Sequence, residues 1–248
     1  MGKRERLDRL LVQRQLVLSR EEGRARILAG EVLVNGQLVT KAGMLVDPTS
    51  EFQLKARSLY VSRGGTKLEK ALREFKIEVQ DKIAIDVGAS TGGFTQCLLA
   101  HGARRVYAVD VGYGQLDWKL RNDPRVVVFE KKNIRYLTLA ELPSAADLAT
   151  IDVSFISLRL VLPPVHRLIG HGGDIIALVK PQFEVGKGKV GKGGVVRSRD
   201  EQLRVVDEIK VAAQNLGLIV QGVTESPLLG PAGNREFFLY LKDSRERQ

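Results

Sequence analysis

Seven short apolar runs, spread over the last three quarters of the chain, constrain the fold more than any other feature. They read KIAIDVG, RRVYAVDVG, RVVVFEK, DLATIDVSF, GDIIALVKPQF, LIVQGVTES and REFFLYLK. Continuous apolar runs that alternate with helical segments are typical of buried parallel strands with helices on both faces. The sequence therefore predicts an α/β fold with a seven-stranded, mostly parallel sheet. No long helix separates the last two runs, which favours a terminal antiparallel pair.

The start of the chain has a different pattern, with two short helices in place of the strand and helix alternation. Leu7 and Leu10 recur at helical spacing in the first. The second opens with Ser19 and carries Glu22 three residues later, the arrangement of a capping box. Gly30 follows the last apolar position, where a glycine commonly ends a helix. These signals predict two helices within the first 30 residues.

A hairpin follows the second helix. Alternating apolar residues flank Asn35-Gly36, the strongest two-residue turn signal for paired strands. We therefore predict a small α+β domain over residues 1–58, a linker over 59–63 and the α/β domain over 64–248. A capping box at Thr66 and Glu69 is expected to start the first helix of the larger domain.

Composition narrows the class of protein. The 248 residues include 39 basic and 29 acidic side chains, a net charge of +10 that favours a polyanionic partner. The single cysteine, Cys97, excludes an internal disulfide, and no histidines at useful spacing suggest a metal site. No apolar run reaches the roughly 18–20 residues needed to cross a bilayer, and charges interrupt the basic N-terminus. We expect a cytoplasmic protein with no membrane partner.

A glycine-rich turn follows the first predicted strand, in the stretch AIDVGASTGGFTQCLLAHGA. Asp86 ends the strand, and Gly88, Gly92 and Gly93 shape the turn into a helix. The spacing differs from the G-x-G-x-x-G fingerprint of dinucleotide sites and from a Walker loop, so a phosphate ligand is disfavoured. In doubly wound sheets ligands bind at the carboxyl ends of strands. Tight packing of helix against strand is the alternative reason for these glycines.

Polar side chains stand at the ends of the next strands as well. Asp110 comes 24 residues after Asp86, and its carboxylate suits two ribose hydroxyls. Asn133 offers an amide for an adenine edge, and Asp152 ends the fourth strand. The alternative is that polar residues begin wherever a strand ends. Four strand ends together with the glycine turn favour a site, and an adenosine ligand without a diphosphate points to S-adenosylmethionine.

Four charged residues are candidates for chemistry: Lys67, Asp152, Lys180 and Glu236. Lys180 closes a very apolar strand. It is either a surface lysine whose stem is buried or a partly desolvated amine suited to proton transfer. The order of the four resembles the K-D-K-E tetrad of RNA ribose 2′-O-methyltransferases.

Nearly the whole chain resembles the TlyA family, once called haemolysins, which joins an S4-type RNA-binding module to an FtsJ-like, Rossmann-like methyltransferase. DVGASTGGFT is similar to the cofactor turn of such enzymes. The residues that carry the rest of the resemblance are RLDRLLVQRQLVLSREEGRARILAGEVLVNGQLV for the S4 module, and SRGGTKLEKAL, VDVGYGQLDWKLRNDPRV and LVKPQFEVGK for the methyltransferase.

The resemblance implies methyl transfer from S-adenosylmethionine to a cytidine 2′-hydroxyl in ribosomal RNA. A ribose hydroxyl needs a base, or a partner for its developing charge, and placement in line with the methyl group. We expect Lys180 to activate the hydroxyl, while Asp152 and Glu236 hold Lys180 and Lys67. Phe94 is an equally good core residue. The expected cofactor-binding residues are Asp86, Gly88, Ser90, Gly92, Gly93, Phe94, Asp110, Asn133 and Asp152.

Basic residues supply two candidate RNA contacts. One is a phosphate-binding face on the first two helices, with an ordinary solvated surface as the alternative. The other is a glycine-rich loop that closes over substrate, with plain disorder as the alternative. We expect ribosomal RNA, within a ribosomal subunit, to be the partner. The residues are Arg4, Arg6, Arg20, Arg24 and Arg26 for the face, and Lys187, Lys189 and Lys192 for the loop.

Three other classes of function compete with this interpretation. A non-catalytic ribosome-binding protein is disfavoured because all four tetrad positions are filled. A pore-forming haemolysin is disfavoured because the seven runs indicate an α/β sheet and not amphipathic membrane strands. A base methyltransferase is disfavoured because the Asn-Pro-Pro-Tyr motif typical of exocyclic amine methylation is absent from the sequence.

Overall fold

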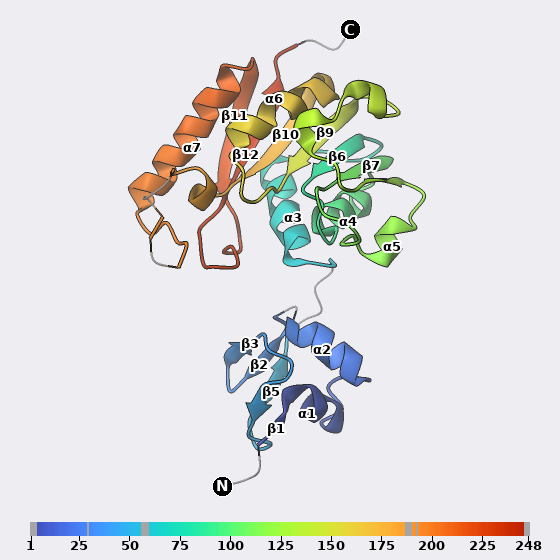
Figure 1. The fold of residues 1–248 in the computed structure, drawn as a ribbon, viewed down its shortest axis with the longest axis vertical. Coiled ribbons are helices and arrows are strands. Elements are labelled where there is room, and N and C mark those ends of the chain that lie inside the picture. The colour runs from blue at the N-terminus through green and yellow to red at the C-terminus, as the bar shows by residue number, and fades with distance from the viewer. Residues whose placement is uncertain (1–3, 29, 56–59, 187–189, 192, 246–248) are drawn as a thin grey trace. The chain divides into compact units, whose positions relative to one another are not determined.

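The computed structural model describes residues 4–28, 30–55, 60–186, 190–191 and 193–245 (Figure 1). Contacts divide the chain into two compact units, Met1–Leu59 and Tyr60–Gln248. We call them the N-terminal unit and the C-terminal unit. Within the described ranges, no helix is both long enough and apolar enough to cross a membrane.

The N-terminal unit has two helices and five short strands. Strands β3, β2 and β5 form one antiparallel sheet, and β1 pairs with β4. One face of each helix packs on the apolar side of the strands, which gives the unit its own small core. The elements are β1 (Glu5–Arg6), α1 (Leu7–Gln13), α2 (Arg20–Leu28), β2 (Val32–Val34), β3 (Gln37–Val39), β4 (Leu45–Val46) and β5 (Phe52–Leu54).

Local signals of the N-terminal unit are confirmed. The Ser19 hydroxyl accepts a hydrogen bond from the Glu22 backbone N–H at 3.1 Å. The Glu22 carboxylate reaches back one residue further than a capping box requires, and accepts from the Leu18 N–H at 2.9 Å. Asn35 and Gly36 have φ of 50° and 75°, the left-handed values that a two-residue hairpin turn needs.

The C-terminal unit contains all seven predicted strands in one sheet of order β11-β12-β10-β9-β6-β7-β8. Its strands are β6 (Ile83–Val87), β7 (Arg105–Val109), β8 (Val126–Phe129), β9 (Ala146–Ile151), β10 (Ile169–Val179), β11 (Leu218–Glu225) and β12 (Phe237–Asp243). Its helices are α3 (Arg63–Phe75), α4 (Gly93–Ala100), α5 (Trp118–Arg121), α6 (Leu158–Leu168) and α7 (Arg199–Gln214), with short 3₁₀ turns η1 (Ile134–Tyr136), η2 (Leu139–Glu141) and η3 (Pro181–Phe183).

The directions of the strands follow the prediction. Strands β10, β9, β6, β7 and β8 run parallel, while β12 is antiparallel to both β10 and β11. A parallel neighbour needs a crossover, and no long helix is available between β11 and β12, so this pair turns back directly. The α/β class and the terminal antiparallel pair are therefore confirmed.

Two core layers sandwich the sheet. Along β6, Ile85 faces a core formed with α6 and α7, whereas Ala84 faces a core formed with α3, α4 and α5. This alternation is the period of two that a strand buried on both faces imposes. Figure 1 shows α6 and α7 on one side of the sheet and α3 and α4 on the other. The sheet is thus covered on both faces, and its strand ends remain for a site.

One helix boundary differs from the prediction. Helix α3 begins at Arg63 with Ser62 as its N-cap, so Thr66 and Glu69 lie inside the helix and form no capping box there. The consequence is functional, because the earlier start places Lys67 one turn inside α3, where its side chain is buried.

Candidate active site

The register of the sheet brings three of the four candidate charges to one edge. Val179, the last residue of β10, pairs with Phe237, the first of β12. Because these strands are antiparallel, Lys180 and Glu236 follow as neighbours at the same edge. Asp152 leaves β9 beside them, and its N–H donates to the Val87 carbonyl at 2.9 Å. Lys67 reaches this edge from α3.

The four charges form two ion pairs. Lys67 Nζ lies 2.6 Å from Glu236 Oε2, and Lys180 Nζ lies 2.6 Å from Asp152 Oδ1. The Lys67–Glu236 pair is the more deeply buried, with side chains 8% and 1% exposed, against 11% and 22% for the Lys180–Asp152 pair. Each amine is therefore held by one carboxylate, and the Lys180 pair is the one that a substrate can approach.

The Glu236 carboxylate has spare hydrogen-bonding capacity. Its Oε1 atom is buried and has no hydrogen-bond partner among the described residues. A Cβ added at Gly230 would lie 2.5 Å from this oxygen, so a larger residue there would push the Glu236 carboxylate aside. A buried acceptor without a partner is costly. Within this site, Oε1 is available to a hydroxyl or amine of a bound molecule.

The glycine turn beside these pairs is shaped by close packing. Gly88, Ser90 and Gly92 all have positive φ. A Cβ at Gly88 would lie 2.4 Å from the Asp152 carbonyl oxygen, and one at Gly93 would lie 2.2 Å from Ser62 Oγ. Tight packing therefore explains these glycines. The same packing brings the turn against Asp152, the residue that pairs with Lys180.

Asp110 ties this turn to the next strand end. Its Oδ2 accepts from the Ser90 N–H at 2.8 Å, and its Oδ1 accepts from the Gly112 N–H at 2.7 Å. A carboxylate has about four acceptor positions, so two remain free for ribose hydroxyls. The geometry fits a nucleoside whose ribose lies over the turn.

Comparison with known proteins identifies the fold and its family. A model of the FtsJ-like methyltransferases matches residues 60–243, and a model of the S4 domain matches residues 5–52. The chain belongs to the FtsJ-like methyltransferase family. YqxC of Bacillus subtilis (strain 168) is 51% identical over 242 residues, covering 97% of this chain and 86% of that protein.

Two further relatives span both units of this FtsJ-like methyltransferase. The 16S/23S rRNA (cytidine-2′-O)-methyltransferase TlyA of Mycobacterium tuberculosis (strain ATCC 25618 / H37Rv) is 48% identical, over 100% of this chain and 93% of its own. A solved structure of a protein named as a hemolysin, from Streptococcus thermophilus, is 44% identical with a TM-score of 0.77, covering 98% and 90% of the two chains. The resemblance to the TlyA family is confirmed.

Two residues expected at the cofactor lie instead in the interior of the methyltransferase. Phe94 is 3% exposed and packs on Phe238 with ring centroids 6.1 Å apart, so the structure places it in the core. Asp86 is fully buried, and its carboxylate accepts from the hydroxyls of Thr95 at 2.7 Å and Thr150 at 3.2 Å. Both residues support the turn from below.

The surroundings of Asp86 have an electrostatic consequence. Burial raises the pKa of Asp86 to about 7, the nearby Asp152 adds to the rise, and the bonds from the threonine hydroxyls oppose it. Asn133 is partly buried after β8, where its side-chain oxygen accepts from the Arg135 N–H at 3.1 Å and caps η1. Its oxygen is therefore engaged in structure, and the amide group is the part that faces a ligand in our interpretation.

Two residues of the loop after β9 contact the segment that follows β10. Ser154 Oγ accepts a hydrogen bond from Lys180 Nζ at 3.0 Å. Phe155 has φ of 63° and is 91% exposed, with its ring 5.0 Å from that of Phe183. A bulky residue in the left-handed region is an outlier that often marks a functional loop. No sequence signal predicts a positive φ at a phenylalanine.

The candidate RNA-binding arginines of the N-terminal unit fall into different environments. Arg6 and Arg20 share the buried carboxylate of Asp8, at 2.9 and 3.0 Å. Arg4 and Arg24 are exposed. Arg26 is mostly buried and lies between Glu22 and Glu31, so the structure removes it from the phosphate-binding face. The predicted loop residues Lys187, Lys189 and Lys192 lie outside the described residues.

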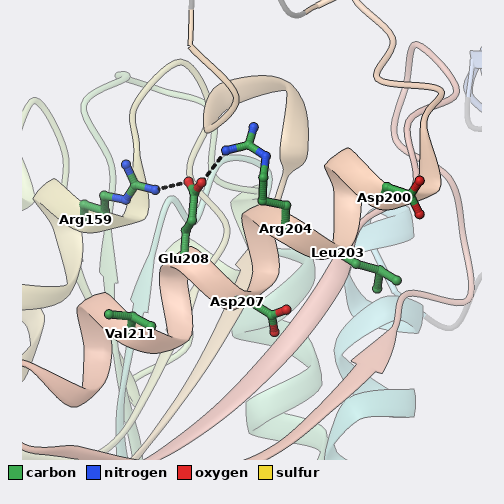
Figure 2. A pocket seen from close by; sticks show the side chains of 7 residues that line it. All are labelled: Arg159, Asp200, Leu203, Arg204, Asp207, Glu208 and Val211. Atoms are coloured by element: carbon green, nitrogen blue, oxygen red, sulfur yellow. Dashed lines mark hydrogen bonds and ion pairs between the residues drawn. The ribbon is translucent and has the colours of Figure 1, made fainter.

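A surface hollow of about 650 Å³ lies elsewhere on the C-terminal unit, along the outer face of α7. Figure 2 shows Glu208 between Arg159 and Arg204, with Asp200, Asp207, Leu203 and Val211 around them. Glu208 forms ion pairs with both arginines. Both arginines of the hollow are thus paired with an acid, and none of the tetrad residues lines it. Size alone does not make this hollow the candidate site.

Proposed function

We propose that this chain transfers the methyl group of S-adenosylmethionine to the 2′-hydroxyl of a cytidine in ribosomal RNA. The observation that carries the proposal is the pair of ion pairs, Lys67–Glu236 and Lys180–Asp152, at the sheet edge that also bears the glycine turn. The M. tuberculosis relative is named for this reaction, which supports the choice of substrate. An rRNA substrate implies a cytoplasmic location.

The residues of the turn fit the cofactor. Gly88 and Ser90 form its floor, and Asp110 offers two free acceptor positions to the ribose. In this proposal the Asn133 amide donates to the adenine edge. When bound, S-adenosylmethionine supplies a methyl carbon activated by a sulfonium. The chain must then hold the attacking oxygen in line with that carbon and exclude water.

Lys180 is the group that meets the target hydroxyl. Asp152 and Ser154 fix its amine from two directions, which leaves the third hydrogen-bonding position of Nζ for the ribose oxygen. As the bond between the 2′-oxygen and the methyl carbon forms, the bond from that carbon to the sulfonium would break and the hydroxyl proton would pass to water, while the positioned amine stabilises the charge that develops on the oxygen. Lys67, held by Glu236, orients the same ribose or its phosphate.

RNA contacts come from both units. Arg6, Arg20, Arg4 and Arg24 supply exposed guanidinium groups for phosphates. Phe155 presents an exposed aromatic face next to Lys180, and an unstacked RNA base binds well on such a face. The target nucleoside in this proposal stacks on Phe155 while its 2′-oxygen meets Lys180.

The test compares Lys180→Met with Lys82→Met. Lys82 is a matched control because it is also paired with a carboxylate of the same sheet, Asp174, at 2.8 Å, but it lies away from the site. With ribosomal subunits from a strain that lacks this gene, Lys180→Met should lower the rate of methyl transfer by about 10²–10⁴-fold. Lys82→Met should retain the rate. Cofactor affinity, measured by calorimetry, should stay the same in both.

The substrate is tested separately by mapping 2′-O-methyl groups in rRNA with and without the gene. A cytidine that loses its 2′-O-methyl group when the gene is removed supports the proposal. A modification that disappears from a base, or no change in either rRNA, contradicts the proposed substrate. A Lys180→Met protein that transfers methyl groups at the wild-type rate removes Lys180 from the mechanism.

A further inference from the structure

The loop between β9 and α6, residues 152–157, is held in an unfavourable conformation. Phe155 within it has φ of 63°, which a bulky side chain rarely adopts. Such conformations persist only when the surroundings impose them. The loop also carries Asp152 and Ser154, both of which contact the Lys180 amine. Whatever fixes this loop therefore also fixes the amine.

Glu184 is the buried residue that fixes it. It lies just after η3, four residues beyond Lys180, and is 9% exposed. Its Oε2 accepts from the Ser157 hydroxyl at 2.6 Å, and its Oε1 accepts from the Leu158 N–H at 2.8 Å. Ser157 is the N-cap of α6, and its hydroxyl oxygen accepts in turn from the Arg159 N–H at 3.2 Å. One carboxylate from a different segment thus accepts hydrogen bonds from two groups at the start of α6.

The two segments touch at further points. Phe155 packs on Phe183, the residue before Glu184, and Ser154 is bonded to Lys180. The loop 152–157, together with the first residue of α6, is therefore joined to the segment 180–184 by an ion pair, three hydrogen bonds and a ring contact. Glu184 accepts two of the three hydrogen bonds.

Among the described residues, the partners of Glu184 are hydrogen-bond donors, and no ion pair explains its position. Burial raises its pKa, the hydrogen bonds from Ser157 and Leu158 oppose the rise, and the charges of Arg159 and Glu208 act in opposite directions. A buried carboxylate without a direct cationic partner is expensive to keep. Two polar donors alone could be satisfied by a neutral side chain, so the acid marks a position where geometry matters.

We propose that Glu184 is a positioning residue, which clamps the loop 152–157 to the segment after Lys180 and so sets the place of the Lys180 amine and the Phe155 ring. The inference rests on the proposed methyl transfer and adds a residue that does not touch the RNA or the cofactor. In this proposal the contacts of Glu184 impose the unfavourable backbone conformation at Phe155, and that conformation serves to position the reacting groups. The loop is held in place for the reaction, and Glu184 holds it.

The test measures single-turnover methyl transfer by the full-length protein, with saturating S-adenosylmethionine and ribosomal subunits from a strain lacking the gene. Glu184→Ala should lower the rate by about 100-fold, because a displacement of roughly 1 Å has that effect on a reacting group. The dissociation constants for cofactor and subunits should stay within about threefold of wild type. Glu184→Gln keeps an acceptor for the Leu158 N–H and should recover most of the rate.

Asp174→Ala is the matched control. Asp174 is a similarly buried acid on β10, bonded to Tyr240 and Lys82 away from the site. It should lower the melting temperature and leave the transfer rate of the folded protein unchanged. If Glu184→Ala does not fold, Ser157→Ala removes the donor to Oε2 together with the N-cap acceptor of the Arg159 N–H, keeps the bond from the Leu158 N–H, and should lower the rate by about tenfold.

The outcomes separate the two proposals. A wild-type protein that transfers no methyl group to rRNA overturns the proposed function. An active wild type whose Glu184→Ala variant keeps the wild-type rate, or loses rate only in proportion to cofactor or RNA affinity, overturns the positioning role alone. When Glu184→Ala does not fold, a Ser157→Ala variant that keeps the wild-type rate overturns it as well.

Discussion

Two buried aspartates, one in each unit, respond to burial in opposite ways. Asp8 of the N-terminal unit lies against Arg6 and Arg20, and their hydrogen bonds lower its pKa to about 2 despite its burial. Asp86 of the C-terminal unit lies against the hydroxyls of Thr95 and Thr150, and burial raises its pKa to about 7. Burial alone therefore does not decide ionisation, because the partners decide it.

The opposite pKa shifts of Asp8 and Asp86 reflect different roles of the two buried acids. In the N-terminal unit the acid is charged and holds the guanidinium groups of Arg6 and Arg20 at the surface. In the C-terminal unit burial raises the pKa of the acid to about 7, so that it is about half protonated near pH 7, and it lies in the core that supports the glycine turn. Glu236 is a third case, since its cationic partner, Lys67, is itself buried. These three acids give three ways to test the comparison.

The largest effect is expected at Glu236. Lys67→Met leaves a fully buried carboxylate without its cation, and breaking such a pair costs about 3–5 kcal/mol of unfolding free energy. Methyl transfer should be lost as well. Chemical denaturation of the C-terminal unit measures the first effect and a transfer assay measures the second.

A double variant divides stability from activity at this pair. Lys67→Met combined with Glu236→Gln removes both charges and should recover most of the stability, because neutral replacements of a buried pair are often tolerated. It should remain inactive. If the double variant is as unstable as Lys67→Met alone, the uncompensated charge is not the cause.

The second effect is a change in how steeply the free energy of unfolding varies with pH. Because the folded state raises the pKa of Asp86 from an ordinary value near 3.9 to about 7, the folded protein binds the extra proton between these values. The stabilising contribution of the protonated Asp86 is complete below about pH 4 and is lost as the pH rises to about 7. Asp86→Asn mimics the neutral acid and should remove about 2–4 kcal/mol of that decline. Thermal unfolding of Asp86→Asn and of the wild type from pH 4.5 to 8.5 measures this difference. Curves of stability against pH that run parallel for the two proteins would contradict the prediction.

The fold was predictable because its signals are local. Apolar runs, the hairpin turn at Asn35-Gly36 and the capping serine at Ser19 each depend on a few adjacent residues. The terminal antiparallel pair also followed, since connection length limits how strands can pair, whereas the order of the seven strands comes from the structure. The start of α3 was missed because Ser62 and Thr66 are equally good capping residues in sequence.

The details of the site depend on contacts that sequence does not display. Thr95 and Thr150 meet Asp86 from 9 and 64 residues away, so its burial as a brace is a tertiary property. Phe94 could face either the turn or the core, and the crossing of α4 over the sheet decided it. Glu184 resembles any surface glutamate until the fold brings Ser157 onto it.

The smallest effect is expected at Asp8, and its sign distinguishes two explanations. Asp8→Asn raises the charge of the N-terminal unit by one, so simple attraction predicts tighter RNA binding. If Asp8 instead fixes Arg6 and Arg20 for phosphates, the variant should bind rRNA more weakly, despite the added charge, and lose about 1.5–3 kcal/mol of stability. That loss mirrors the acid dependence of the wild type, whose Asp8 contribution is present above about pH 4 and disappears as the pH falls towards 2.

Glu21→Gln makes the same change of charge on the exposed first turn of α2, next to Arg20, and serves as the matched control for Asp8→Asn. It should bind rRNA slightly more tightly, as simple attraction requires. Filter binding at several salt concentrations compares the two variants, and Asp8→Asn should also show a smaller dependence on salt, because fewer phosphates are engaged. If both variants bind more tightly by the same factor, Asp8 does not position the arginines, and the contrast between the two buried aspartates is one of pKa alone.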